Sequence, residues 1–346
     1  MIEKKGKIRI LGIESSCDET AAAVVEDGRR VISNIISSQI DIHTVYGGVV
    51  PEIASRLHCQ NINGVIKLSL KEAGLGFEDI DAIAVTAGPG LVGALLIGVS
   101  EAKALAYVLR KPLIAVHHIE GHVAANYISH PELEPPYVCL IVSGGHTNLC
   151  IVKDFESYEI IGKSVDDAAG EAYDKVARAV GLGYPGGPKV DKAAKDGDPH
   201  AIELPLGEVS GRPYDFTFSG LKSAALNHIN RIRMMGGTVN VSDLAASFQY
   251  AVVTSLVERT IACAKEFGFR KVAMAGGVSA NSGLRAAMQF ACEREGMSCY
   301  YPEPIYCTDN GAMIAAAAYP KFLRGDFADL SLNAAPDLRL SGSLRR

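Results

Sequence analysis

Two histidines four residues apart, His118 and His122, have the spacing of a metal-binding pair. If the segment 116–125 is a helix, both imidazoles lie on one face within reach of a single cation. Two ordinary helix histidines would show the same spacing, so a third ligand decides between these interpretations. Asp309 is the candidate, because it follows an irregular stretch and precedes an alanine-rich segment. A helix cap is the alternative role for this carboxylate.

The residues around the histidine pair argue against a zinc protease. Such an enzyme needs a glutamate directly after the first histidine, where it acts as general base. Ile119 occupies that position here, and Glu120 comes one residue later. With 3.6 residues per turn, Glu120 lies about 200° around the helix from either histidine. We therefore expect Glu120 to face away from any metal that the pair binds.

Asp18 and Glu19 lie in a polar turn between two apolar segments, 8–13 and 21–25. Turn carboxylates are commonly solvated. A pair at the tip of a hairpin can also bind magnesium or act as a general base near a phosphate. The sequence leaves these two interpretations open.

A second acidic group crowds one short segment, which we expect to be helical: Asp166, Asp167, Glu171 and Asp174. The last three have the spacing i, i+4 and i+7, which places like charges on one helix face and costs some tenths of a kcal/mol. A solvated acidic face is the default interpretation. A polar ligand or a cation facing the group is the alternative.

Two glycine turns, 143–147 and 276–278, each follow an apolar strand candidate directly. The sequence has no GxxxxGK[ST] phosphate loop, and Gly220 is followed too closely by Lys222 to form one. Backbone amides at such turns, and at the helix start near Asn281, suit phosphate or ribose oxygens. The turns therefore predict a nucleotide site built on hairpins.

The elements that position these residues alternate between strands and helices. Apolar runs predict strands at 8–13, 21–25, 80–86, 137–142, 148–152 and 271–275, and a long helix at 92–109. Two hairpins of similar design indicate that the two halves are duplicated. We therefore expect two α/β domains with a cleft between them and a boundary near 130–136, where three prolines interrupt both periodicities.

The bulk composition is that of a globular protein without a membrane span. The chain has 346 residues, 48% of them apolar, and no apolar run reaches the roughly 18 residues of a membrane helix. We read no signal peptide and expect a cytoplasmic location. The 8 cysteines are scattered without a CxxC pair, so we expect reduced thiols. A net charge of −5 gives no overall basic footprint for nucleic acid.

Ordered motifs along residues 8–332 resemble the TsaD family, which synthesises threonylcarbamoyladenosine in tRNA and was formerly labelled a glycoprotease. The motifs are GIESSCDET (12–20), YGGVVPEIASR (46–56), TAGPGLVGALLIG (86–98), HHIEGH (117–122), LIVSGGHTNL (140–149), DDAAGEAYDKVAR (166–178), YPGGP (184–188), FSGLKS (218–223), MAGGVSAN (274–281) and CTDNGAMIA (307–315). The arginine-rich end, 344–346, departs from the family pattern.

The resemblance implies a fold and a reaction. The fold is the duplicated actin-like, sugar-kinase and heat-shock ATPase superfold, with a first domain at 1–130 plus 309–330, a second at 131–308 and a tail at 331–346. The reaction moves a threonylcarbamoyl group from threonylcarbamoyl-adenylate to the N6 amine of adenosine 37, in tRNAs that read codons beginning with A, and releases AMP. The family makes the donor with a separate synthase and works with the accessory subunits TsaB, a shorter paralogue, and TsaE, a small ATPase.

The resemblance also implies roles for individual residues. His118, His122 and Asp309 are the expected ligands of a divalent metal, Fe(2+) in the first place, with zinc or magnesium as substitutes in vitro. The expected site for threonylcarbamoyl-AMP, ATP or analogues comprises Ile141, Val142, Ser143, Gly144, Gly145, Asp174, Gly187, Asp191 and Asn281. Asp18 and Glu19 are the expected catalytic pair, with Asp18 removing the proton from the amine.

Two rival hypotheses remain beside this one. A small-molecule carbamoyltransferase or sugar kinase can share the fold, since fold alone does not define function. Such a carbamoyltransferase usually carries an extra domain that makes its own adenylate, and this chain has no length to spare for one. A non-catalytic scaffold paralogue is the other rival, and the presence of both histidines and Asp309 argues against it.

Overall fold

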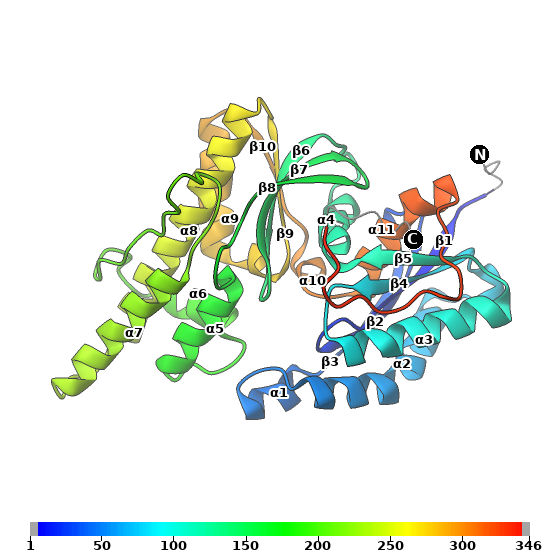
Figure 1. Cartoon of the computed structure of the whole chain (residues 1–346), viewed down its shortest axis with the longest axis horizontal. Coiled ribbons are helices and arrows are strands. Elements are labelled where there is room, and N and C mark those ends of the chain that lie inside the picture. Colours follow the sequence, from blue (N-terminus) through cyan, green and yellow to red (C-terminus); the bar gives the residue numbers. More distant parts are fainter. Residues whose placement is uncertain (1–5, 341–346) are drawn as a thin grey trace. The chain divides into compact units, whose positions relative to one another are not determined.

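The computed structural model describes residues 6–340, which form two compact units. Unit 1 contains the residues up to Glu134, the short segment Phe155–Ser157 and the residues from Pro302 onward. Unit 2 contains Pro135–Asp154 and Tyr158–Tyr301. Each unit is an α/β domain built on its own five-stranded sheet, as predicted (Figure 1).

The sheet of unit 1 has the order β3-β2-β1-β4-β5. The first three strands pair antiparallel, whereas β4 runs parallel to both β1 and β5. The predicted N-terminal hairpin is confirmed. The strands are β1 (Arg9–Glu14), β2 (Glu19–Glu26), β3 (Arg30–Ser38), β4 (Ala82–Gly88) and β5 (Leu113–His117).

Helices cover both faces of this sheet, and the alternation of side chains along β1 explains how. Leu11 and Ile13 belong to a core cluster with residues of α2 (Pro51–Ala73) and α3 (Val92–Leu109). Gly12 points to the opposite face, where α11 (Gly311–Arg324) packs so closely that a Cβ on Gly12 would lie 2.3 Å from the Gly311 carbonyl oxygen. Helix α4 (His118–Ser129) packs beside α11. Shorter helices of this unit are α1 (Ile40–Tyr46), η1 (Phe77–Asp79) and α10 (Pro304–Cys307).

Helix α3 has the bounds predicted from sequence. Among residues 6–340 it is the one helix whose length and apolar composition match a membrane span. It contacts both α2 and β4, as expected of a helix that covers a sheet face in a globular domain.

The sheet of unit 2 repeats the order of the first, since β8-β7-β6-β9-β10 corresponds to β3-β2-β1-β4-β5. Strands β6 and β7 pair antiparallel, and β9 runs parallel to β6 and β10. The predicted duplication is therefore confirmed. The strands are β6 (Tyr137–Val142), β7 (Thr147–Asp154), β8 (Ser157–Lys163), β9 (Lys271–Ala275) and β10 (Ser298–Tyr300).

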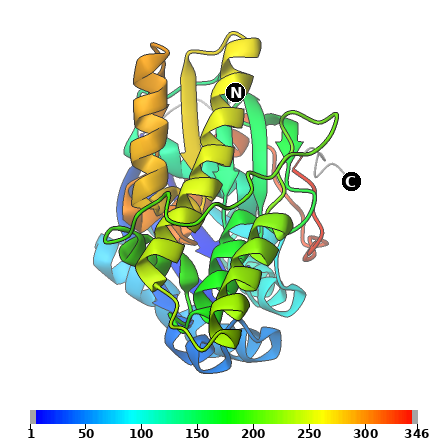
Figure 2. The ribbon, with the colours of Figure 1, turned by 90° about the vertical axis from the view of Figure 1, so that its left-hand side faces the viewer.

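The core of unit 2 lies between this sheet and its helices. Helix α8 carries Phe248 and Leu256, which are fully buried in one cluster with residues of β6, β9, α5 and α7. Helix α8 packs against both α7 and α9 (Figure 2). The helices are α5 (Ala169–Ala179), α6 (Gly186–Ala194), α7 (Ser219–Met234), α8 (Val241–Glu266), η2 (Gly277–Ala280) and α9 (Ser282–Arg294).

The bounds of unit 1 differ from the expected first domain at 131–134, at Phe155–Ser157 and at both ends of its C-terminal segment. Residues 302–308, expected in the second domain, belong to unit 1, and the Glu303 amide donates to the Ser129 hydroxyl at 2.9 Å. The expected tail from 331 is part of unit 1 as far as it is described. The Ala335 amide bonds to the Ala87 carbonyl at 2.7 Å, and Leu340 is buried. The arginine-rich end at 344–346 lies outside the described residues.

Candidate functional site

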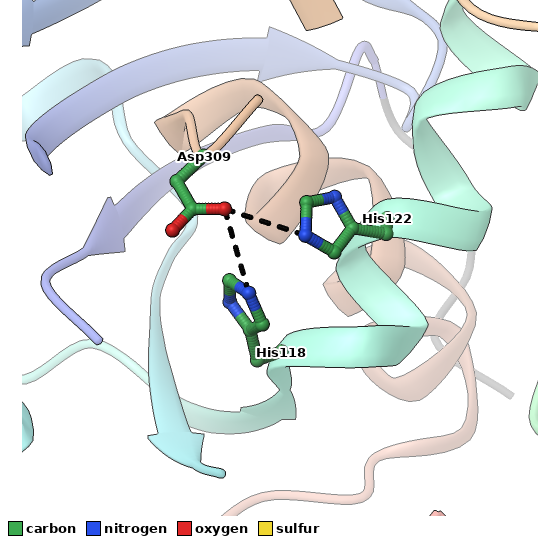
Figure 3. Close-up of side chains that lie close together, drawn as sticks. All are labelled: His118, His122 and Asp309. Atoms are coloured by element: carbon green, nitrogen blue, oxygen red, sulfur yellow. Dashed lines mark ion pairs between the residues drawn. The ribbon is translucent and has the colours of Figure 1, made fainter. Parts of the chain in front are cut away.

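His118, His122 and Asp309 converge in unit 1, as the sequence predicted (Figure 3). The Nε2 atoms of His118 and His122 lie 3.4 Å and 3.3 Å from the same carboxylate oxygen, Oδ1 of Asp309. The two rings meet edge to face with centroids 4.6 Å apart. Both imidazoles therefore present their outer nitrogen to one point next to the carboxylate, which is how three ligands enclose a single cation.

Local sequence explains how α4 and α11 bring these ligands together. Helix α4 begins at His118, directly after β5, so the histidines project one turn apart. Gly121 lies between them in sequence, and a Cβ there would lie 2.8 Å from Cδ1 of Ile314 on α11. The absence of a side chain at this position lets the two helices approach closely. Asp309 then reaches the histidines from the loop before α11.

The alternative role of Asp309 as a helix cap is not observed. The N-cap of α11 is the next residue, Asn310, whose Oδ1 accepts the Met313 amide at 2.9 Å. The carboxylate of Asp309 is turned toward the histidines instead (Figure 3). Glu120 forms an ion pair with Lys321 at 2.9 Å, which agrees with its expected orientation away from the histidines.

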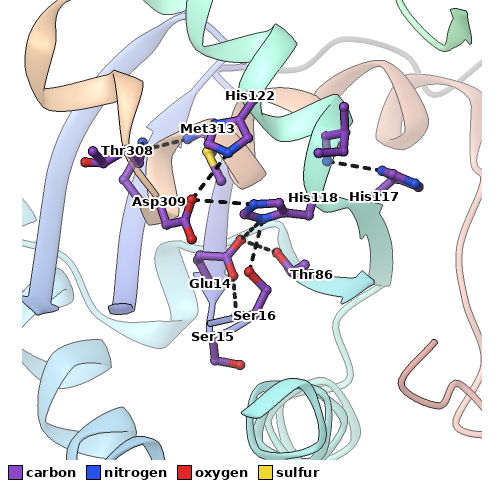
Figure 4. Close-up of polar contacts among 12 residues, drawn as sticks. Glu14, Ser15, Ser16, Thr86, His117, His118, His122, Thr308, Asp309 and Met313 are labelled. Atoms are coloured by element: carbon purple, nitrogen blue, oxygen red, sulfur yellow. Dashed lines mark hydrogen bonds and ion pairs between the residues drawn. The ribbon is translucent and has the colours of Figure 1, made fainter. Parts of the chain in front are cut away.

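A second layer of polar groups holds His118 from its other ring nitrogen (Figure 4). Nδ1 of His118 lies 3.0 Å from Oε2 of Glu14 and 3.1 Å from the hydroxyl of Ser16. The same Oε2 accepts the Thr86 hydroxyl at 2.7 Å, and Oε1 accepts the Ser16 amide at 2.5 Å. Glu14 is fully buried at the end of β1. The sequence analysis missed it, although a lone glutamate closing an apolar strand beside the GIESS motif was a usable signal.

Opposite charges set the protonation of this pair. Burial would lower the pKa of His118, but the carboxylates of Asp309 and Glu14 outweigh it and raise that pKa to about 9. Burial likewise opposes ionisation of Glu14, yet the charge and hydrogen bond of His118 lower the pKa of this carboxyl below its ordinary value. The site therefore favours positive charge at the position where a cation would bind.

The donor set fits a divalent transition metal. Two imidazole nitrogens and one carboxylate oxygen suit iron or zinc and leave coordination positions open for a substrate. Nδ1 of His122 is buried and makes no hydrogen bond in the described part of the chain. The nitrogens that face Asp309 are the Nε2 atoms of both histidines, so the three side chains can hold one ion between them.

Asp18 and Glu19 are buried, so the interpretation as solvated turn residues is wrong. Burial, together with the nearby carboxylates of Asp309 and Asp18, raises the pKa of Glu19 to about 10. Glu19 therefore holds a proton at neutral pH, and its Oε1 accepts the Ser38 hydroxyl at 3.2 Å.

His58 of α2 holds the turn between β1 and β2 in place. Its Nε2 lies 2.9 Å from the Cys17 carbonyl oxygen, and its Nδ1 lies 2.8 Å from the Thr20 hydroxyl. The sequence analysis did not identify His58.

The glycine turn 143–147 of unit 2 is open on one side. A Cβ on Gly144 or Gly145 would meet no protein atom within 4 Å. The other side of the turn is closed, because a Cβ on Gly170 would lie 2.6 Å from the Ser143 carbonyl. The start of α5 thus packs directly against the turn. Ile141 and Val142 are fully buried in β6, so their side chains are closed to a ligand.

The other residues predicted to bind the adenylate lie near the starts of α9 and α6. Gly276, with φ +88, lies so close to β6 that a Cβ would be 2.6 Å from the Val142 carbonyl. Asn281 caps α9 by accepting the Leu284 amide at 2.8 Å, and Asp191 accepts the Ser282 amide at 3.1 Å. Asp174 accepts the Gly186 amide at 2.6 Å, and the adjacent Gly187 is open.

The acidic segment 166–174 differs from its prediction. Helix α5 begins at Ala169, so Asp166 and Asp167 precede it and do not share a helix face with Asp174. Asp166 accepts the Phe218 amide at 2.9 Å and so ties this loop to α7. Asp167 forms ion pairs with Lys175 and Lys222. These cations and amides remove the expected like-charge repulsion.

Comparison with solved structures first defines the class of protein. Full-length HypF in a phosphate- and nucleotide-bound form matches 93% of this chain and 47% of its own, with a TM-score of 0.61 at 16% identity. Component A of the (R)-2-hydroxyglutaryl-CoA dehydratase of Acidaminococcus fermentans matches 91% of this chain and 98% of its own, with a TM-score of 0.54 at 15% identity. These likenesses show the fold, which is the duplicated α/β fold of the actin-like ATPases.

Sequence comparison then gives the family. Residues 30–316 match the family described as tRNA N6-adenosine threonylcarbamoyltransferase. Relatives of that name are 59% identical in Clostridium perfringens and 55% identical in Caldicellulosiruptor bescii, each over 96% of this chain and 98% of the relative. The chain belongs to the tRNA N6-adenosine threonylcarbamoyltransferase family, as the motifs predicted.

Proposed function

We propose that this chain transfers the threonylcarbamoyl group of threonylcarbamoyl-adenylate to the N6 amine of adenosine 37, in tRNAs that read codons beginning with A. The observation that carries the proposal is the convergence of His118, His122 and Asp309 in a chain that is 59% identical to a relative bearing this activity as its name. A scaffold paralogue has no need for three ligands around one point.

The reaction is an acyl transfer from a mixed anhydride. The N6 amine attacks the carbamoyl carbon, the bond from that carbon to the phosphate oxygen breaks, and AMP leaves with the electron pair. His118, His122 and Asp309 would hold a divalent metal, which would supply Lewis-acid stabilisation of negative charge. Backbone amides of the turn 143–147 hold the adenylate phosphate, since the open side of Gly144 and Gly145 admits it.

Asp18 is the proposed general base for the amine proton. Asp18 is buried beside Glu19 in the turn between β1 and β2, in the same unit as His118, His122 and Asp309. A carboxylate held there can accept the proton that the N6 amine loses as the new bond forms. We assign Glu19 to the same catalytic pair.

The finer assignments belong to the same proposal. We assign Fe(2+) as the metal, a cytoplasmic location, and a working complex with a donor synthase and with TsaB-like and TsaE-like subunits. We further propose that Asp174, Gly187, Asp191 and Asn281 complete the adenylate site.

Reconstitution tests the proposal directly. The protein is combined with tRNA, threonine, bicarbonate, ATP and the partner proteins, and nucleosides are analysed by mass spectrometry. We expect threonylcarbamoyladenosine with the wild type. His118→Ala and Asp309→Ala should stay folded but lose most bound metal by elemental analysis, because three ligands leave no redundancy. Full metal occupancy in both variants would refute the metal assignment, and absence of the modified nucleoside with all components present would refute the function.

A further inference from the structure

Helix α7 is locally basic in an acidic protein. The whole chain has a net charge of −5, yet residues 219–242 contain Lys222, Arg231 and Arg233 and no aspartate or glutamate. A nucleic-acid substrate is held largely by cations that neutralise its phosphates. An acidic chain must therefore concentrate such contacts locally, and α7 is a place where it does so.

A cavity of about 330 Å³ lies between α5 and α7. It is lined by Lys175, Arg178 and Ala179 from α5 and by Lys222 and Leu226 from α7, so every charged residue in its lining is a cation. Arg233 extends this edge, because its Nη2 donates to the Ala179 carbonyl at 2.7 Å. We call this feature the α5–α7 groove.

The two lysines are held in place from behind. Lys175 lies 3.1 Å from Asp167, and Lys222 contacts the other oxygen of the same carboxylate at 2.5 Å. Burial opposes ionisation of Asp167, but its hydrogen bonds to Lys222 and Lys175 lower its pKa below the ordinary value. Lys175 also pairs with Glu171 at 2.7 Å. Side chains fixed in this way lose little further freedom when an anion binds.

Positive charge remains after these pairs are counted. Four cations, Lys175, Arg178, Lys222 and Arg233, face two carboxylates, Asp167 and Glu171, which leaves two positive charges. Arg178 is exposed, and its side chain makes no ion pair or hydrogen bond with any residue in the described part of the chain. Its guanidinium is free to engage a phosphate through two parallel N–H donors.

We propose that the α5–α7 groove binds the sugar–phosphate backbone of the tRNA substrate. The inference rests on the proposed function, which supplies a polyanionic partner. Arg178 and Arg233 bind phosphates of the tRNA directly. Lys175 and Lys222, which are held by Asp167, add a fixed positive charge at the base of the groove. A row of phosphates fits a groove bordered by cations from two helices better than a single small anion does.

The test compares cations on the two sides of α7. Arg233 lies on the same face as Lys222, eleven residues away, whereas Arg231 lies roughly 180° from Lys222 by the helical period. Arg231 is exposed and forms no ion pair among the described residues, so Arg231→Gln is a matched control. The test variants are Arg178→Gln and the double variant Arg178→Gln/Arg233→Gln, each checked for unchanged thermal unfolding and metal content.

The readout is the dependence of tRNA affinity on salt, measured in the complete complex. Each lost phosphate contact should reduce the slope of log K against log salt by about 0.7–0.9. We expect one such step for Arg178→Gln, a larger reduction for the double variant and no change for Arg231→Gln. An unchanged slope in the double variant, or an equal reduction in Arg231→Gln, would overturn the inference.

Two further comparisons distinguish this inference from failure of the proposed function and from binding of a small anion. If the wild-type complex makes no threonylcarbamoyladenosine, the proposed function fails, whereas an active wild type with an unchanged slope in the variants refutes the groove alone. The second comparison measures binding of inorganic phosphate alone by calorimetry. A phosphate affinity that the double variant abolishes, together with an unchanged tRNA salt slope, would reassign the groove to a small free anion. A reduced slope in the double variant supports backbone binding.

Discussion

His118 shows how one residue can serve two partners at once. Its Nε2 faces Asp309, and its Nδ1 bonds to the buried carboxylate of Glu14 at 3.0 Å. A carboxylate behind a ligating histidine fixes the tautomer and raises the basicity of the nitrogen that faces the metal. In the proposed metal site, Glu14 therefore positions His118 and is not a ligand itself.

Glu14→Gln should weaken metal binding about 10- to 100-fold, because glutamine keeps the size of the side chain but not its charge. Competitive metal titration of the folded protein measures the affinity. Ser16→Ala is the control, since it removes the second partner of Nδ1 and leaves the carboxylate in place. The control should retain most of the affinity. Equal affinity in Glu14→Gln and wild type would contradict the assignment.

The protonated state of Glu19 predicts a dependence of stability on pH. In the folded protein its pKa is about 10, and the ordinary value is 4.5. Between these values the unfolded state releases the proton and the folded state keeps it, so the free energy of unfolding falls as pH rises, by at most about 1.4 kcal/mol per pH unit. Glu19→Gln lacks this penalty. Its stability relative to wild type should increase from pH 5 to pH 8.

Urea unfolding of the metal-free proteins at the two pH values tests this expectation. The metal-free state is needed because a bound cation would favour the ionised carboxylate. A stability difference between wild type and Glu19→Gln that is the same at pH 5 and pH 8 would show that Glu19 is ionised in the folded protein.

At the scale of helices and strands, the features that depend on local sequence periodicity were predicted correctly. The bounds of α3, the two hairpins and the one-face spacing of His118 and His122 follow from local pattern, and all three are observed. Contacts between elements were not predictable in the same way. The burial of Asp18, the support of His118 by Glu14 and the start of α5 at Ala169 depend on what packs across from each residue.

We expect opposite effects from substituting two glycines of unit 2, because there is space for a side chain at Gly145 and none at Gly170. Gly145→Val should leave stability nearly unchanged and weaken adenine-nucleotide binding, since the new side chain meets only the space in which we place the phosphate. Gly170→Val should destabilise the fold by about 1–3 kcal/mol, because its Cβ would lie 2.6 Å from the Ser143 carbonyl. Calorimetry with AMP and thermal unfolding give the two readouts. Unchanged nucleotide affinity in a folded Gly145→Val would mean that the donor site is misplaced.

Substitution of Asn281 tests the proposed adenylate site less directly than substitution of Gly145, because Asn281 also has a structural role. Its carboxamide accepts the Leu284 amide as the cap of α9 and donates to Gln249 at 2.7 Å. Removal of such a cap typically costs about 1 kcal/mol. Any loss of nucleotide affinity in Asn281→Ala would therefore combine a local structural effect with the loss of a ligand contact.

At the scale of the whole molecule, charge predicts a division of labour. With a net charge of −5, this chain alone should bind adenine nucleotide yet modify tRNA poorly, and should gain activity when the donor synthase and accessory subunits are added. In that active mixture Asp18→Ala should abolish transfer and spare metal binding, because we place its carboxylate at the reacting amine. Robust modification by the isolated chain from a purified donor would refute the partner requirement, and full activity of Asp18→Ala would refute its role as the base.

Unit 1 is discontinuous in sequence, and this limits the order in which its parts can assemble during synthesis. His118 and Asp309 are separated by 191 positions, and all of unit 2 lies between them in the chain. Domains tend to fold as units while the ribosome is still extending the chain. A nascent chain that ends before Pro302 has both histidines but neither the carboxylate nor α11, which covers one face of the first sheet. The group of three candidate ligands can therefore assemble only after synthesis has passed Asp309.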